Sequence, residues 1–203
     1  MLRILRAHET GMMFCLIFLF GYSQQAQEVS SEENVDSVMA AKVASIKEYG
    51  LRETGSSAQV STHFSEDEIA RFLSGSSHVP ESVGDIQITL VGDNRFIASY
   101  VIDLDHIEVA RSDDLLDPMN YLQGQLPMVM EAKVYSEAGN GRLQIERVEL
   151  SGIELPDALV RETIARYTRS ANNPDGWDID EFYRFPYRIK EVRVDSGEVI
   201  VVQ

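Results

Sequence analysis

Cysteine is almost absent from this 203-residue chain, and the one copy, Cys15, lies in an apolar run near the N-terminus. A single thiol cannot form an intramolecular disulfide, so packing must hold the fold together. Long apolar runs are absent too. The longest, at residues 12–20, is less than half of the about 20 residues that a membrane-spanning helix needs.

Basic residues are scarce, with 18 Lys and Arg against 33 Asp and Glu and a formal net charge of −15. A surface of this sign repels nucleic-acid phosphates and anionic lipid head groups. The acidic residues are scattered along the chain, without a block of five or more like charges. We therefore exclude nucleic acid as a partner and interpret the charge as an aid to solubility.

Signatures of catalysis are missing as well. The chain has no Gly-x-Ser-x-Gly turn for a nucleophilic serine, no Gly-rich phosphate loop and only four histidines. Acidic pairs such as Glu66 with Glu68 resemble the two carboxylates of a glycosidase, but a chain this acidic contains many such pairs by chance. We predict that the protein is not an enzyme and carries no cofactor.

The N-terminal residues have the layout of a secretory signal peptide. Arg3 and Arg6 precede the apolar run, and small and polar residues ending at Ser23 follow it. We predict a signal peptide at 1–23 that is cleaved after Ser23. Cleavage after Ala26 and retention of the segment as an anchor are the alternatives.

Cleavage after residue 23 leaves 180 residues (203 − 23), with 16 basic against 32 acidic residues and a net charge of −16. We interpret residues 24–31 as a disordered leader and 32–203 as one domain of a size that can bury a core. The expected location is extracytoplasmic, either periplasmic or secreted, with no stable membrane span once the signal peptide is removed.

Three segments have the apolar spacing of amphipathic helices. The first spans residues 32–49. Ser65 and Glu68 have the spacing of a capping box, which predicts a short second helix that ends near Gly75. Pro156 suits the first turn of a third helix that extends to Tyr167.

From residue 83 the apolar period changes from 3.6 to 2, which indicates half-buried strands. The alternation predicts hairpins at 83–104, 126–150 and 187–202, with turns rich in Gly, Asn and Asp. A slip in phase near Glu146 predicts a β-bulge. The expected fold class is α+β: a curved antiparallel sheet of about six to seven strands in sequential hairpins, packed on two or three amphipathic helices.

Two acidic stretches resemble metal sites. Alternation places Asp103 and Asp105 on one face of a strand and His106 on the other, so three ligands do not converge. The loop at 173–181 has Asn and Asp near a glycine, as an EF-hand does, but lacks the acidic residues at the first and last ligand positions. We predict that neither stretch is a metal site.

The order of these parts resembles that of secreted bacterial lipid-binding proteins of the tubular, TULIP-like class. The resemblance rests on the Ser-Glu-Asp-Glu-Ile helix start at 65–69, the hairpins, the Ile-x-Leu-Pro break at 153–156 and the closing strand pattern at 188–197. It covers most of the chain after the signal peptide. It implies an elongated sheet wrapped on a helix, with an apolar groove.

Apolar side chains from the second hairpin and the third helix are candidates for the lining of such a groove. They are Met128, Met130, Val134, Leu159, Val160 and Ile164. A filled core is the alternative interpretation of the same stripe, since one-sided helices exist mainly to bury that face. The sequence thus leaves two hypotheses: a carrier of a lipid or small apolar ligand, and a packed module that binds another envelope protein.

Overall fold

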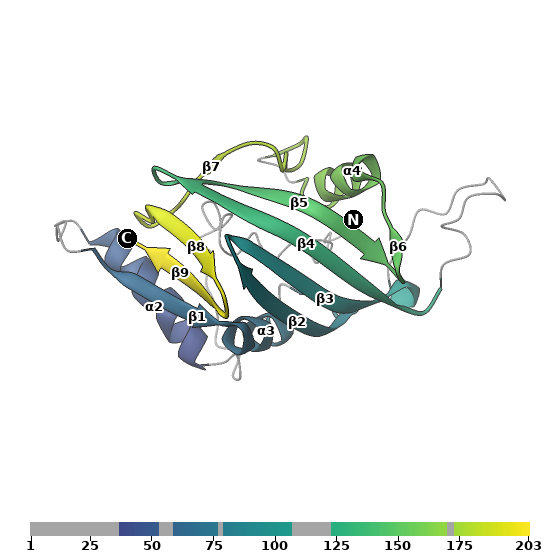
Figure 1. Cartoon of the computed structure of the whole chain (residues 1–203), viewed down its shortest axis with the longest axis horizontal. Helices are drawn as coiled ribbons and strands as arrows, with labels where there is room; N and C mark the ends of the chain where they lie inside the picture. The colour runs from purple at the N-terminus through teal and green to yellow at the C-terminus, as the bar shows by residue number, and fades with distance from the viewer. Residues whose placement is uncertain (1–36, 53–58, 77–78, 107–122, 170–172) are drawn as a thin grey trace, which may run out of the picture.

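The computed structural model describes residues 37–52, 59–76, 79–106, 123–169 and 173–203, and these form an α+β fold (Figure 1). The predicted fold class is confirmed. The helices are α2 (Ser37–Leu51), α3 (Glu66–Ser74) and α4 (Asp157–Tyr167), with a short 3-10 helix, η1 (Leu104–His106). The predicted signal peptide and leader, and residues 32–36 of the first helix, lie outside the described residues.

The strands divide between two antiparallel sheets. The large sheet has the order β2-β3-β4-β5-β6, with β7 also pairing with β5. Its strands are β2 (Val83–Gly92), β3 (Arg95–Asp103), β4 (Gln125–Glu137), β5 (Asn140–Leu150), β6 (Ile153–Glu154) and β7 (Tyr183–Arg184). The small sheet has the order β1-β9-β8, with β1 (Ser61–Ser65), β8 (Glu191–Asp195) and β9 (Glu198–Val202).

The large sheet has one apolar face because its apolar residues alternate along each strand. Ala98 lies opposite Met130, and Met130 lies opposite Val148, so these side chains share the inner face. Glu131 pairs with Arg147 whereas Ala132 pairs with Ile145, which leaves an extra residue on β5. The β-bulge predicted near Glu146 is therefore confirmed, and it restores the apolar phase of β5 after the slip.

Polar groups at the hairpin ends join the two sheets. The Asn94 side-chain oxygen accepts a hydrogen bond from the Val194 amide, and the Asn94 amide donates to the Val194 carbonyl, each at 3.0 Å. The Ser136 hydroxyl accepts from the Val192 amide at 2.9 Å. These bonds satisfy the free edge of β8, which would otherwise expose unpaired backbone groups.

Two clusters of buried apolar side chains lie against the inner face of the large sheet. The first lies among that face, the small sheet, α2 and α3, and includes Val134, Val201 and Phe72. The second includes Met128 and is covered by Leu155 and Val160, at the start of α4. Figure 1 shows this division, with the small sheet, α2 and α3 toward one end of the large sheet and α4 beside β5 and β6.

Within the described residues, no helix is both long and apolar enough to cross a membrane. The predicted capping box is confirmed at the start of α3. The Ser65 hydroxyl accepts from the Glu68 amide at 3.3 Å, and the Glu68 carboxylate accepts from the Ser65 amide at 2.9 Å. Pro156 is the N-cap of α4, one residue before the predicted position.

The loop after α4 packs directly on that helix. A Cβ atom on Gly176 would lie 1.8 Å from the Ala165 carbonyl oxygen, so only glycine allows this approach. The Thr168 hydroxyl accepts from the Trp177 amide at 2.6 Å, and the Trp177 ring stacks on Tyr183 at 4.6 Å between centroids. The loop therefore ties α4 to β7.

Replacement of Gly176 by alanine tests this close approach, with Gly152→Ala as the matched control. Both glycines have positive φ, +82° and +79°, but a Cβ on Gly152 would meet nothing within 4 Å. Both variants carry the cost of left-handed backbone, about 1–2 kcal/mol, and Gly176→Ala adds about 1–3 kcal/mol for overpacking. Urea denaturation measures the difference, and equal losses for the two variants would contradict the packing of the loop on α4.

Candidate functional site

The six residues predicted to line a groove are divided between the two core clusters and other positions of α4. Met128 lies in the second core cluster, with Met130 and Val160 packed against it, whereas Val134 is 1% exposed in the first cluster. Ile164 is buried at 8% exposure, outside both clusters. Three of the six thus come together, and they do so within a packed core.

Leu159 differs from the prediction, since it is 39% exposed although the helical stripe predicted burial. The side of α4 that is turned inward consists of Val160, Thr163 and Ile164, all at least partly buried. Residues i and i+4 share a helix face, so contact centred on Val160 and Ile164 leaves Leu159 on the flank. The buried side of α4 is therefore narrower than its apolar stripe predicts.

The space around Met128 is filled from β3. Tyr100 lies directly opposite Met128 across the sheet, and its hydroxyl donates a hydrogen bond to the Met128 sulfur at 2.7 Å. A phenolic hydroxyl in an apolar cluster needs a partner, and the thioether supplies a weak one. Met128 is therefore part of a satisfied core contact.

An apolar cavity lies elsewhere, between α2, α3 and the small sheet. Met39, Val43 and Ile46 line it from α2, while Phe72 lines it from α3 and Val201 from β9. Tyr187 and its neighbours close the remaining side. The apolar spacing of residues 32–49 predicts a buried side for α2, but the wall from the C-terminal hairpin depends on pairing between distant segments.

The volume of this cavity, about 70 Å³, limits what it can hold. At about 10–15 Å³ for each water, this is room for about five to seven water molecules. An engineered cavity known to bind benzene has about 150 Å³, roughly twice as much. A lipid chain does not fit in this arrangement of α2, α3 and the small sheet.

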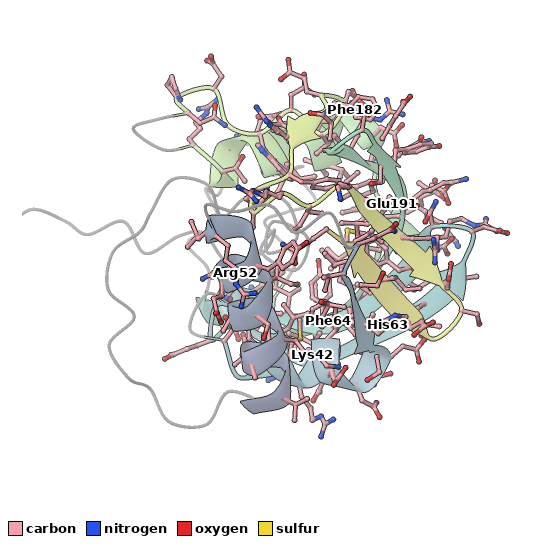
Figure 2. All side chains as sticks on the ribbon, turned by 90° about the vertical axis from the view of Figure 1, so that its left-hand side faces the viewer. Lys42, Arg52, His63, Phe64, Phe182 and Glu191 are labelled. Carbon is pink, nitrogen blue, oxygen red and sulfur yellow. The ribbon has the colours of Figure 1, made fainter. Side chains whose placement is uncertain are left out.

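A polar network fastens α2 beside this cavity. The Lys42 ammonium donates to both Glu68 carboxylate oxygens, at 2.6 and 2.8 Å, and to the His63 carbonyl at 2.8 Å. It also lies 5.6 Å from the centre of the Phe64 ring. Figure 2 shows Lys42 and Phe64 together between α2 and the small sheet, with His63 on the far side of β1.

The same network perturbs one carboxyl group. The hydrogen bond from Lys42, followed by that from the Ser65 amide, holds the pKa of Glu68 below its ordinary value of 4.5. The Glu68 side chain is 15% exposed, so both partners are partly shielded from water. Lys42 also caps the free edge of β1 through the His63 carbonyl, which protects that edge from pairing with another strand.

The two acidic stretches serve the local fold. Asp103 accepts from the Asp105 amide at 3.0 Å, and Asp105 accepts from the Gly124 amide at 3.1 Å. In the loop after α4, Asp178 accepts from the Asp180 amide at 2.9 Å, and Asp180 pairs with Arg161. Among the described residues, no three His, Cys, Asp or Glu side chains are grouped as metal ligands would be.

Comparison with known proteins assigns the chain to no family. No family model, no curated protein and no solved structure matches it. The resemblance to TULIP-like proteins stays a prediction.

Glu68→Gln tests the polar network through the pH dependence of stability. Because the pKa of Glu68 is lowered on folding, its charged form stabilises the fold above pH 4.5, and this contribution is lost as the pH falls through the lowered value. We expect the stability difference between wild type and Glu68→Gln to be constant near neutral pH and to shrink in acid. Urea denaturation over a pH series measures it.

The matched control for that series is Glu81→Gln, which removes the charge of an exposed carboxylate that has no ion pair within the described residues. Its stability difference from wild type is expected to stay small at every pH. A difference for Glu68→Gln that grows as the pH falls would contradict the assignment.

Proposed function

We propose that the protein is a non-enzymatic, exported binding module that recognises another envelope protein through its surface. The observation that carries this proposal is the packed interior. Both core clusters are filled with buried side chains, and the cavity beside α2 holds only about 70 Å³. A second space of about 710 Å³ is an open cleft at the surface, between the end of α2, the β4–β5 turn and residues 184–190. Surface residues, and not a closed internal cavity, are therefore the means of recognition that we propose.

The proposal of export rests on the signal-like layout of residues 1–23, and the proposal of a non-enzyme rests on the missing catalytic motifs. The contacts of several charged side chains among the described residues also support the proposal of a non-enzyme. Lys42 is committed to Glu68, Arg161 to Asp180, and Asp105 to a backbone amide. Groups held in structural contacts of this kind are not poised to transfer protons to a substrate.

Native mass spectrometry of the purified protein, followed by organic extraction, tests the packed interior. We expect the mass of the polypeptide alone and an extract without lipid, because a cavity of about 70 Å³ cannot hold an acyl chain. Co-purified lipid in stoichiometric amount would overturn the proposal in favour of the carrier. Denatured protein from the same preparation supplies the reference mass.

A carrier of a small apolar ligand is the second candidate function, and the cavity beside α2 favours it. Its walls are apolar apart from Lys47, and α2 covers one side as a separate helix. A ligand larger than the cavity needs α2 to move away from the small sheet. Such a movement requires breaking the contacts of Lys42 with Glu68 and with the His63 carbonyl.

Val43→Ile distinguishes an empty cavity from an occupied one. The added methylene fills a void and is expected to raise the free energy of unfolding by up to about 0.8 kcal/mol. Val38→Ile adds the same group to α2 at a position that is 52% exposed, and it is expected to be neutral. Urea denaturation in which Val43→Ile is less stable than Val38→Ile would indicate that a ligand occupies the site.

A further inference from the structure

Four basic residues lie in a row on the outer face of the large sheet, opposite the core. Arg95 on β3 is paired directly with Lys133 on β4, and Arg142 on β5 is paired with Tyr135 of β4. Arg184 on β7 lies opposite Asn140, two residues before Arg142. Because directly paired residues share a face and alternate residues along a strand do too, all four point outward.

None of these four cations forms an ion pair within the described residues, although the chain has 33 acidic residues to supply partners. Arg95 and Lys133 even lie directly opposite each other, an arrangement of like charges that destabilises a sheet. Glu137, at the end of β4 opposite Asn140, is a nearby carboxylate, and it pairs with none of them.

The neighbouring part of the same face is arranged in the opposite way. Arg147 contacts three carboxylates, with Glu131 at 3.4 Å, Glu154 at 3.6 Å and Glu149 as the third partner. It lies opposite Glu131, two residues before Lys133 on β4. Charges on this face are thus separated: the bulged half has one Arg among three carboxylates and an excess of negative charge, and the half toward the β4–β5 turn is left cationic.

Aromatic rings hold the central cation of the row. The Arg142 guanidinium lies 4.8 Å from the centre of the Tyr135 ring and 5.3 Å from that of Phe182. The Lys133 ammonium lies 5.6 Å from the same Tyr135 ring. Among the described residues, Arg142 Nε is the buried side-chain nitrogen or oxygen that lacks a hydrogen-bond partner. The rings thus fix the guanidinium. Because Nε is buried, an incoming anion would meet the two Nη groups, which form no hydrogen bond among the described residues.

A fixed guanidinium is suited to a planar anion. Arg presents its donors as a rigid fork that matches a carboxylate, and stacking between rings removes the conformational freedom that binding would otherwise cost. Phe182 is 51% exposed and adds an apolar contact beside the fork. Figure 2 shows Phe182 far from His63 and Lys42, so this surface is distinct from the network that fastens α2.

The dimensions of the row favour a short segment. From β3 through β4 and β5 to β7 there are three strand spacings of about 4.8 Å, or about 14 Å, and the row also shifts by four residues, about 14 Å, along the strands. The row is therefore about 20 Å long, which an extended chain of about six residues spans. A long polyanion extends past the row onto Glu131, Glu149 and Glu154, and a net charge of −15 repels it.

We propose that Arg95, Lys133, Arg142 and Arg184, with Tyr135 and Phe182, form a docking strip for a short acidic segment of a partner protein. This inference specifies the kind of partner that the proposed interaction module binds, and it therefore rests on that proposed function. Arg142 binds one carboxylate through its fork, and the flanking cations bind neighbouring carboxylates as single charges.

Fluorescence anisotropy with a labelled hexaglutamate peptide and the full-length protein tests the strip. We expect saturable binding that weakens at least about fivefold in Arg142→Gln, because the oriented fork is lost. Arg142→Lys keeps the charge but not the fork, and it is expected to weaken binding by a similar factor. Arg166→Gln, which removes an equal charge from a cation paired with Glu162 on α4, is the matched control and should bind as wild type does.

Four results would overturn the strip. The first three are equal binding by Arg142→Gln and Arg166→Gln, equal binding of a labelled hexaglutamine peptide, and no binding of hexaglutamate at millimolar protein. The fourth is equal displacement of the peptide by inorganic phosphate and by free glutamate at the same concentration. The site would then recognise negative charge in general and not the carboxylate group. Circular dichroism confirms that each variant is folded. If the docking strip is disproved, the proposal of a packed interior still stands, because native mass spectrometry tests it separately.

Discussion

The apolar inner face of the large sheet is the constraint on which the rest of the structure depends. Strand alternation gathers apolar side chains from β2 to β5 on one surface, which must be removed from water. The chain covers it with the small sheet, α2 and α3 over one half and α4 over the other. These covers come from residues 37–74 and 155–203, so both ends of the described chain are drawn over its middle.

Covering the face in this way leaves a cavity of only about 70 Å³ among α2, α3 and the small sheet. Met130 and Ile145 contact both core clusters, so the inner face is filled without a break between its two halves. The outer face is polar but not uniform: carboxylates surround Arg147, whereas Arg142 is held by two rings without a carboxylate. Both arginines lie on β5 and are paired with residues of β4, Arg147 with Glu131 and Arg142 with Tyr135.

Local features of this fold could be predicted from the sequence, since they depend on short stretches. Alternation predicted the hairpins, the spacing of Ser65 and Glu68 predicted the start of α3, and the slip in apolar phase predicted the bulge at Glu146. The division into two sheets could not be predicted in this way. β1 and β9 pair across the whole domain, with Ser61 opposite Val202, and no local pattern specifies such a partner.

The candidate sites were predictable only in part, for the same reason. Periodicity predicts that Met128 and Met130 share an inner face, but it does not predict what covers that face. Here Leu155 and Val160 pack against it. The cavity beside α2 needs a wall from β9 and Tyr187. The cationic row needs the register of four strands, and residues 95, 133, 142 and 184 have no common spacing along the sequence.

Hydrogen exchange of the native protein tests the central claim, a packed interior under fixed covers, most directly. If α2 is a fixed part of the core, amides in its buried turns around Ile46 exchange in the same slow class as those of β9. The account predicts this common protection. Fast exchange throughout α2, while β9 and β4 stay protected, would contradict it, because α2 would then be a cover that opens over an apolar groove.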